Sequence, residues 1–215
     1  SMTPETPPDG TLVYQFADLS GQGNHTTQAT EGAKLLYKVG IVNGHPSVRS
    51  DGSNDYLATS ALPLLTNCTF FAICKRNGTP ATYHNLWGSF QSFNVVGAPP
   101  LQLYATDPGT IQVYADTAGL LLDSGVALSA SPQIITVTKD NSGGGTIEIL
   151  IDGVSKDTGT GNQIVASQPF FLGGWNTNFN NGDCMEQIVY NRALAAADRR
   201  RVERYLGRKF SIAVS

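Results

Sequence analysis

The sequence predicts an all-β fold in which two antiparallel sheets pack as a sandwich, followed by one short C-terminal helix. Only 14% of the 215 residues are charged and 23 are Gly, a composition typical of short strands joined by turns. Strand-like apolar runs alternate with clusters of Gly, Asn, Asp and Pro between Leu12 and Tyr190. Over residues 192–210 the apolar residues instead recur at the spacing of one helix face.

Apolar runs between these turn clusters are predicted as strands. They are residues 12–16, 47–49, 56–59, 69–75, 85–90, 93–96, 101–105, 111–115, 133–139, 146–151, 170–172 and 185–190. Residues 140–145, Asp-Asn-Ser-Gly-Gly-Gly, are the clearest hairpin turn, because Gly and Asn tolerate the positive φ that such a turn demands. We therefore expect the runs on either side of this turn to pair with each other.

The predicted helix at residues 192–210 combines an apolar face, which includes Leu206 and Phe210, with a concentration of positive charge. Residues 192–215 hold seven basic and two acidic side chains, net +5, whereas the rest of the chain holds seven basic and fifteen acidic side chains, net −8. A basic helix can bind nucleic acid or an anionic membrane. We expect instead that it lies on the acidic sandwich and closes the fold, with neither nucleic-acid binding nor membrane insertion.

Residues 11–215 are expected to form one domain, because β-sandwiches commonly reach this length undivided. Residues 1–10 are interpreted as a stiff Pro-containing linker with a cloning remnant at its start. Cys68 and Cys74 lie at the two ends of one apolar run. On a single strand they would be about 20 Å apart. A disulfide needs much closer Cα atoms, so the cysteines are predicted to be buried free thiols.

Four stretches together resemble a known family. They are Asp-Leu-Ser-Gly-Gln-Gly-Asn at residues 18–24, the pair of segments at 42–48 and 51–57, Ile-Asp-Gly at 151–153, and the ending from 182 to 210 with its Tyr-Asn-Arg-Ala-Leu corner. This pattern resembles the laminin-G-like branch of the concanavalin A-like lectin and glucanase superfamily. The resemblance covers nearly the whole chain, and it implies a two-sheet antiparallel jelly roll with one concave sheet.

That resemblance implies no single function, since its members include carbohydrate-binding modules, adhesion domains, glucanases, polysaccharide lyases and parts of bacteriophage virions. Glycoside cleavage needs two carboxylates across the bond, yet Glu148 and Glu186 each stand alone among apolar neighbours. The three histidines lie in turn-like segments without the clustering of the lyases. The chain is therefore expected not to be an enzyme. By resemblance Glu186 is a structural acid, with Arg192 as its expected partner.

Two neighbouring segments, Leu-Gln-Leu-Tyr at 101–104 and Ile-Gln-Val-Tyr at 111–114, supply the main candidate binding surface. Strand alternation puts the aliphatic residues on one face and the polar ones on the other. The polar face holds Gln102, Tyr104, Gln112 and Tyr114. Aromatic rings beside amides suit sugars, because a ring stacks on pyranose C–H groups while amides bond to hydroxyls. The alternative is that Tyr and Gln simply suit a solvated sheet surface.

Two aromatic segments expected in loops or at strand ends add further candidates. They contribute His84, Trp87, Trp175, Asn176, Asn178 and Phe179. Exposed loop aromatics indicate contact with a partner, whereas the alternative is that each Trp caps an edge of the sandwich. No cofactor is expected. Calcium is left open at two sets of oxygen ligands, Asp18 with Asn24 and Asp51 with Asn54 and Asp55, where the alternative is a hydrogen bond to the local backbone.

The function that these patterns favour is a non-catalytic carbohydrate-binding or adhesion module, a lectin of bacterial or bacteriophage origin. The alternative is a structural virion protein of a capsid or tail that uses the jelly roll for assembly, and a polysaccharide-degrading enzyme comes third. The expected partner is a glycan, or another protein of a virion or cell surface. The expected location is extracellular, at the cell surface or in a virion.

Overall fold

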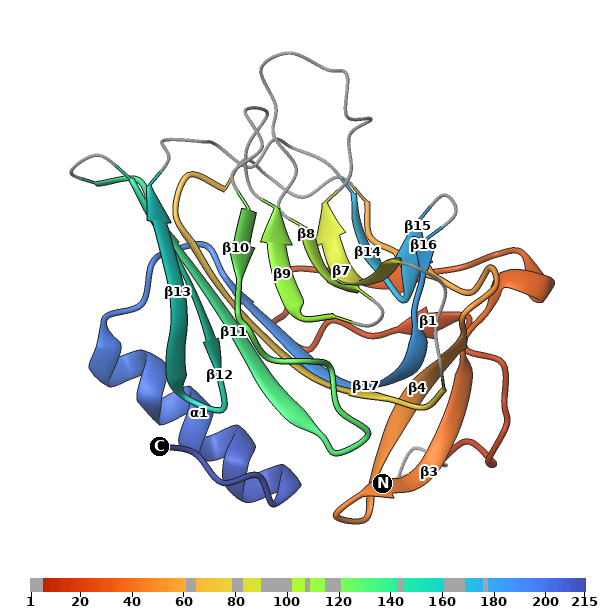
Figure 1. Cartoon of the computed structure of the whole chain (residues 1–215). Helices are drawn as coiled ribbons and strands as arrows, with labels where there is room; N and C mark the ends of the chain where they lie inside the picture. Colours follow the sequence, from red (N-terminus) through yellow and green to blue (C-terminus); the bar gives the residue numbers. More distant parts are fainter. Residues whose placement is uncertain are drawn as a thin grey trace.

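The computed structural model describes residues 6–60, 65–78, 83–89, 102–106, 109–114, 121–142, 145–160, 169–175 and 178–215. In this part of the chain, two sheets and one helix form three layers (Figure 1). The seven-stranded sheet lies between the ten-stranded sheet and α1 (Ala196–Phe210). The predicted all-β jelly-roll sandwich with one C-terminal helix is confirmed.

The strands of the two sheets are as follows. The larger sheet has the order β1 (Gln15–Phe16), β2 (Thr26–Thr27), β5 (Leu57–Ala58), β14 (Phe170–Leu172), β7 (Tyr83–Ser89), β8 (Gln102–Thr106), β9 (Ile111–Tyr114) and β10 (Leu121–Asp123), with β15 (Gly174–Trp175) and β16 (Asn178–Phe179) beside β7. The smaller sheet has the order β13 (Val154–Thr160), β12 (Thr146–Ile151), β11 (Gln133–Asp140), β6 (Cys68–Arg76), β17 (Asn181–Tyr190), β4 (His45–Asp51) and β3 (Leu36–Val42). Pairing is antiparallel except between β16 and β7.

Strand β6 shows why one apolar run in the sequence has no polar alternation. Phe70 and Ala72 pack into the core between the two sheets. Phe71 and Ile73, on the opposite face, pack into a second core between the seven-stranded sheet and α1. A strand that is buried on both faces is apolar at every position, so its period of two is hidden in the sequence. The three cysteines are buried and free, as predicted.

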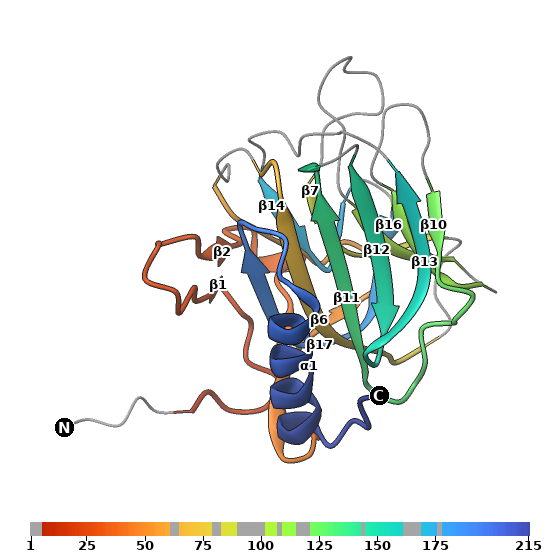
Figure 2. The same ribbon diagram turned by 90° about the vertical axis from the view of Figure 1, so that its left-hand side faces the viewer.

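The helix begins four residues later than expected, at Ala196 instead of Arg192. Thr69 on β6 holds the preceding corner, because its Oγ1 accepts the N–H of Leu194 (2.9 Å) and donates to the carbonyl of Arg192 (3.0 Å). From there α1 crosses the outer face of the seven-stranded sheet (Figure 2). Leu206 and Phe210 are buried on that face. No helix in the described part of the chain is long and apolar enough to cross a membrane.

Several strand predictions needed correction. Strand β3 was missed because Gly40, with φ +63°, interrupts its pattern inside an irregular pairing with β4. Strand β13 was missed because six of its seven residues, including Lys156, are small or polar. The predicted run 12–16 shrinks to β1, and the run 93–96 lies outside the described residues. The strands flanking residues 140–145 pair in register, as predicted.

Candidate functional site

A polar row crosses four adjacent strands of the ten-stranded sheet. The register pairs Asn85 of β7 with Tyr104 of β8, and Tyr104 with Gln112 of β9. Gln112 pairs in turn with Asp123 of β10. We call these four residues, Asn85, Tyr104, Gln112 and Asp123, the polar row. Neighbouring members are therefore separated by the strand spacing of about 4.8 Å.

The alternation predicted for β8 and β9 is confirmed where side chains are described. Leu103, Ile111 and Val113 are at most 2% exposed in the core between the sheets. Gln112 and Tyr114 alternate with them and are half-buried. The register pairs Gln102 with Tyr114, so the four predicted polar residues lie on two neighbouring strands. The side chains of Gln102 and Tyr104, and the whole of Leu101, lie outside the described part of the structure.

Asp123 is a member of the row that sequence reasoning missed. Its Oδ2 accepts a hydrogen bond from Nε2 of Gln112 (2.8 Å), and its Oδ1 accepts one from the N–H of Gly125 (2.9 Å). Partial burial raises the pKa of Asp123, but hydrogen bonds from Thr110, Gly125 and Gln112 outweigh it and lower that pKa below its ordinary value. The row therefore ends in a carboxylate that stays ionised. Asp123 follows three leucines, so no signal in the sequence distinguished it.

The two aromatic segments come together beside this row. Residues 83–87 belong to strand β7, so Trp87 lies within the predicted strand run 85–90, paired to Leu103 of β8, and His84 lies near the start of that strand. Trp175 pairs with Asn178 in the β15–β16 hairpin, whose Phe179 pairs with Asn85. The pairing of Phe179 with Asn85 thus extends the polar row from β7 to the β15–β16 hairpin. Asn176, and the side chains of His84, Trp87, Trp175 and Asn178, lie outside the described residues.

Gly174 is expected to be essential for the position of the β15–β16 hairpin. A methyl group at this position would lie 2.8 Å from Cα of Phe179, too close for any side-chain rearrangement to relieve. The variant Gly174→Ala should therefore lose about 1–3 kcal/mol of stability through overpacking. Urea unfolding of the variant measures this loss. Gly125→Ala is not a fair comparison because its φ is positive, whereas Gly32→Ala meets no atom within 4 Å and should cost far less.

The first calcium candidate, Asp18 with Asn24, forms a turn that bonds to its own backbone. The two carboxylate oxygens of Asp18 accept the N–H groups of Ser20 (2.8 Å) and Asn24 (2.9 Å). Its own N–H donates to Nδ1 of His25 (2.9 Å). Within the described residues, no three His, Cys, Asp or Glu side chains gather as metal ligands. The backbone alternative therefore accounts for these oxygens, and calcium binding there stays a prediction.

The second candidate, Asp51 with Asp55, brings two carboxylates close together. Oδ2 of Asp55 accepts the N–H of Asp51 (3.1 Å), and Oδ1 of Asp51 accepts the N–H of Ser53 (2.7 Å). Burial, and then the negative charge of Asp51, raises the pKa of Asp55 from its ordinary 3.8 to about 6. Asp55 therefore titrates in a range that stability measurements can follow.

The raised pKa of Asp55 predicts a pH-dependent loss of stability. Because the folded state holds the Asp55 proton more tightly, the protonated Asp55 side chain contributes to the free energy of unfolding. This contribution is complete below about pH 4 and is lost as the pH rises through 6. Asp55→Asn keeps an acceptor for the Asp51 N–H and should raise the free energy of unfolding at pH 7 by about 1–2 kcal/mol. Urea titrations at several pH values measure it. Parallel pH profiles for the variant and the parent protein would contradict this prediction.

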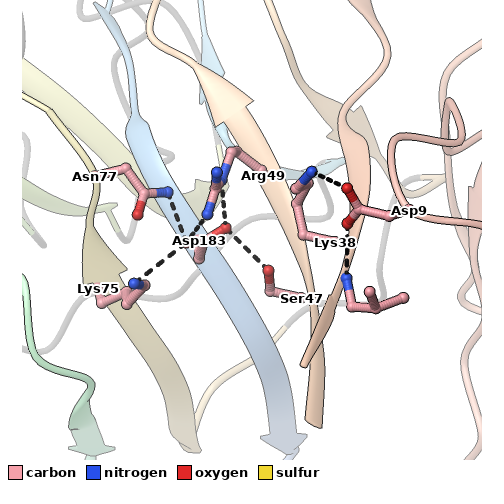
Figure 3. Close-up of polar contacts among 8 residues, drawn as sticks. Asp9, Lys38, Ser47, Arg49, Lys75, Asn77 and Asp183 are labelled. Atoms are coloured by element: carbon pink, nitrogen blue, oxygen red, sulfur yellow. Dashed lines mark hydrogen bonds and ion pairs between the residues drawn. The ribbon is translucent and has the colours of Figure 1, made fainter. Parts of the chain in front are cut away.

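A buried carboxylate, Asp183, joins three strands on the outer face of the seven-stranded sheet (Figure 3). Its Oδ1 accepts hydrogen bonds from Oγ of Ser47 and Nε of Arg49, both 2.9 Å. Its Oδ2 accepts Nη2 of Arg49 (2.9 Å) and Nδ2 of Asn77 (2.6 Å), with Nζ of Lys75 at 3.8 Å. These five contacts occupy both oxygens. The Asp183 cluster is therefore a structural tie between β4, β6 and β17, with no oxygen left for a ligand.

The two isolated glutamates hold the helix to the sheet. Glu186 pairs with Lys209 at 2.7 Å, so the expected partner Arg192 was wrong. Arg192 is held by the Thr69 corner and is exposed. Glu148 pairs with Arg199 at 2.5 Å. Both carboxylates thus lie under α1, on the sheet opposite the polar row.

Comparison with known proteins gives structural neighbours only. No family model matches the chain, and no curated protein matches its sequence. The binding domain of Paraclostridial Mosquitocidal Protein 1 superposes with a TM-score of 0.67 at 15% identity, covering 92% of this chain and 51% of that one. Domain 4 of AbnA, a GH43 extracellular arabinanase from Geobacillus stearothermophilus solved with arabinotriose, gives 0.60 at 16% identity, covering 81% and 84%.

Two further structural neighbours have still lower sequence identity. The SAP-like pentraxin of Limulus polyphemus gives a TM-score of 0.57 at 11% identity, covering 73% of this chain and 81% of that one. A Trypanosoma rangeli sialidase gives 0.57 at 13% identity, and this chain spans 29% of its length. At such low identities these likenesses show the fold, a jelly-roll β-sandwich, and leave the function to be argued from the residues.

Proposed function

We propose that this chain is a non-catalytic carbohydrate-binding module, of bacterial or bacteriophage origin, that binds a glycan along the polar row. The single observation that carries the proposal is the register that sets Asn85, Tyr104, Gln112 and Asp123 side by side across four strands. Amides and a carboxylate exchange hydrogen bonds with sugar hydroxyls, and tyrosine rings offer a face for C–H groups. Among the described side chains, Gln112 and Asp123 supply the polar groups and Tyr114 supplies a ring.

The Gln112–Asp123 pair is preorganised for such a ligand. The Asp123 carboxylate is held by Gly125 at Oδ1 and by Gln112 at Oδ2, and the backbone N–H of Asp123 donates to Oδ2 of Asp157 on β13 (2.9 Å), which fixes the strand beneath it. Gln112 is oriented in turn by Asp123. Side chains that are already held in place lose little entropy on binding. The AbnA domain, which was solved with arabinotriose, supports the proposal by likeness of fold.

The charge state of the row supports the non-catalytic part of the proposal. A glycosidase keeps one carboxyl group protonated as a general acid by raising its pKa. The pKa of Asp123 is lowered instead. The oxygens of its neighbour Asp157 accept the N–H groups of Asp123 and Thr158. Asp123 therefore suits hydrogen bonding to hydroxyls, and it does not suit proton transfer to a leaving group.

A glycan array followed by calorimetry tests the proposal. The variant Gln112→Ala should weaken binding of the best glycan about five- to tenfold, the equivalent of one hydrogen bond of about 1–1.5 kcal/mol. Tyr114→Ala should weaken it by a comparable factor. Gln22→Ala, in an exposed loop away from the row, is the matched control and should bind like the parent protein. Trp175→Ala tests whether the binding surface extends to the hairpin.

Three results would overturn this function. Absence of glycan binding together with a defined ring or shell in mass photometry would support a structural virion protein. Depolymerisation of a polysaccharide would contradict the non-catalytic assignment. Equal affinities of Gln112→Ala and Gln22→Ala for the array ligand would place its site elsewhere on the molecule.

A further inference from the structure

Three arginines form a row along the exposed side of helix α1. We call Arg200, Arg204 and Arg208 the arginine row. All three are exposed, and they follow one another at intervals of four residues. With a rise of 1.5 Å per residue, successive members are about 6 Å apart along the axis and the row is about 12 Å long. Helical periodicity keeps residues four apart on nearly the same side.

The positive charge of this row is not neutralised within the described part of the chain. The other basic residues of the helix are paired: Arg199 with Glu148, Arg201 with Asp198, and Lys209 with Glu186. None of the six ion pairs found among the described residues includes a member of the arginine row. Internal complementation of the helix, expected from the sequence, therefore extends to only part of its charge.

The remaining acid on the helix, Glu203, forms no ion pair with the arginine row. Glu203 is fully buried beneath α1, where its Oε1 accepts a hydrogen bond from Oγ1 of Thr136 (2.9 Å). Burial raises the pKa of Glu203, although the hydrogen bond from Thr136 and the charges of Arg199 and Arg200 act in the opposite direction. The arginine row thus faces solvent as a line of three charges.

A hollow of about 450 Å³ lies against the C-terminal half of this row. Arg204 and Arg208 line it together with Gly207 and residues 211–214. The hollow exists because the tail folds back on the helix: a methyl group at Gly207 would lie 2.6 Å from Cγ2 of Val214. The hollow is shallow and open to solvent. Two guanidinium groups and the aliphatic residues Ile212 and Val214 therefore share one concave surface.

We infer that the arginine row and its hollow form a second binding site, for an acidic polysaccharide that carries uronate carboxylates. A guanidinium offers a planar fork of donors that matches a carboxylate in two parallel hydrogen bonds. The aliphatic side chains of Ile212 and Val214 suit the C–H face of the same sugar ring. This site lies on the sheet opposite the polar row and does not rest on the function proposed for that row.

The surroundings of the row favour a polysaccharide over a membrane or a nucleic-acid duplex. The apolar face of α1, with Leu206 and Phe210, is buried on the sheet and cannot insert into a bilayer. The chain as a whole has a net charge of −3, and residues outside 192–215 carry −8. A protein with this net negative charge repels a large and densely charged duplex, whereas a single thin polysaccharide chain can lie along a row of about 12 Å.

Calorimetry with polygalacturonate, and with neutral dextran as the blank, tests this site. The triple variant Arg200→Gln/Arg204→Gln/Arg208→Gln should bind polygalacturonate at least about tenfold more weakly at physiological salt. A matched control, Lys34→Gln/Lys156→Gln/Arg192→Gln, removes three positive charges outside the row, so both variants reach a net charge of −6. The control should stay within about threefold of the parent protein.

Four outcomes would overturn the inference. They are no binding of polygalacturonate by the parent protein, equal weakening in both triple variants, equal affinity for dextran, and tighter binding to phosphatidylserine vesicles or single-stranded DNA. Gln112→Ala should keep the full affinity for polygalacturonate. Failure of the polar row as a glycan site therefore leaves this second site standing, and the reverse also holds.

Discussion

Asp183→Ala is expected to lower the free energy of unfolding by about 3–5 kcal/mol, the cost of breaking a buried ion pair from one side. The carboxylate of Asp183 is fully buried, and it accepts hydrogen bonds from Ser47, Arg49 and Asn77. Its loss leaves those donors without their acceptor. It also leaves Arg49 and Lys75, which both contact Asp183, as two like charges without the carboxylate between them.

Chemical unfolding in urea measures this effect, with Asp198→Ala as the matched control. Asp198 also pairs with an arginine, but the Asp198 and Arg201 side chains are 49% and 79% exposed. An exposed pair of this kind contributes at most about 0.5 kcal/mol. Similar losses in the two variants would contradict the role given to Asp183. Asp183→Asn keeps part of the hydrogen bonding and should fall between the two.

The parts of the site that sequence reasoning reached are those that depend on alternation alone. In β8 and β9 a period of two separates Leu103 and Val113 from Gln112 and Tyr114, and the burial of these residues follows that pattern. Alternation is a local property, so a single strand is enough to reveal it. It therefore predicted which residues of β9 point away from the core between the sheets.

The composition of the polar row could not be predicted, because it depends on which strands become neighbours. Asn85, Gln112 and Asp123 lie far apart in the sequence, and only the register of three strand pairs aligns them. The same is true of Phe179, which pairs with Asn85 although 94 positions separate the two residues in the sequence. Nothing in a local pattern specifies a pairing over such a distance.

The same limit explains the wrong partner of Glu186. Arg192 is six positions away in the sequence, yet Thr69 holds the residue 192–194 corner, and the helix returns Lys209 to the carboxylate. Ion pairs across a helix–sheet contact depend on where the helix begins and how it crosses the strands. The charge of the helix was evident from composition, but which basic residues remain free for a ligand is decided by these contacts.

Phe71→Ala is expected to have the other large effect on stability, about 3–5 kcal/mol. Phe71 is 1% exposed and fills the core between β6 and α1, with its ring 6.1 Å from that of Tyr190 in an edge-to-face arrangement. Its removal leaves a cavity beneath the helix, because the flanking strands β11 and β17 fix the backbone on both sides.

Tyr205→Ala, on the same helix, is the control that shows whether this core holds the helix in place. Tyr205 is 47% exposed and contacts Lys209 through its ring face at 5.7 Å, so its loss should cost no more than about 1 kcal/mol. Thermal unfolding followed by circular dichroism at 222 nm in both variants measures the difference. If Phe71→Ala proved as mild as Tyr205→Ala, the helix would not depend on this core. The arginine row would then lack the rigid support that a preorganised anion site requires.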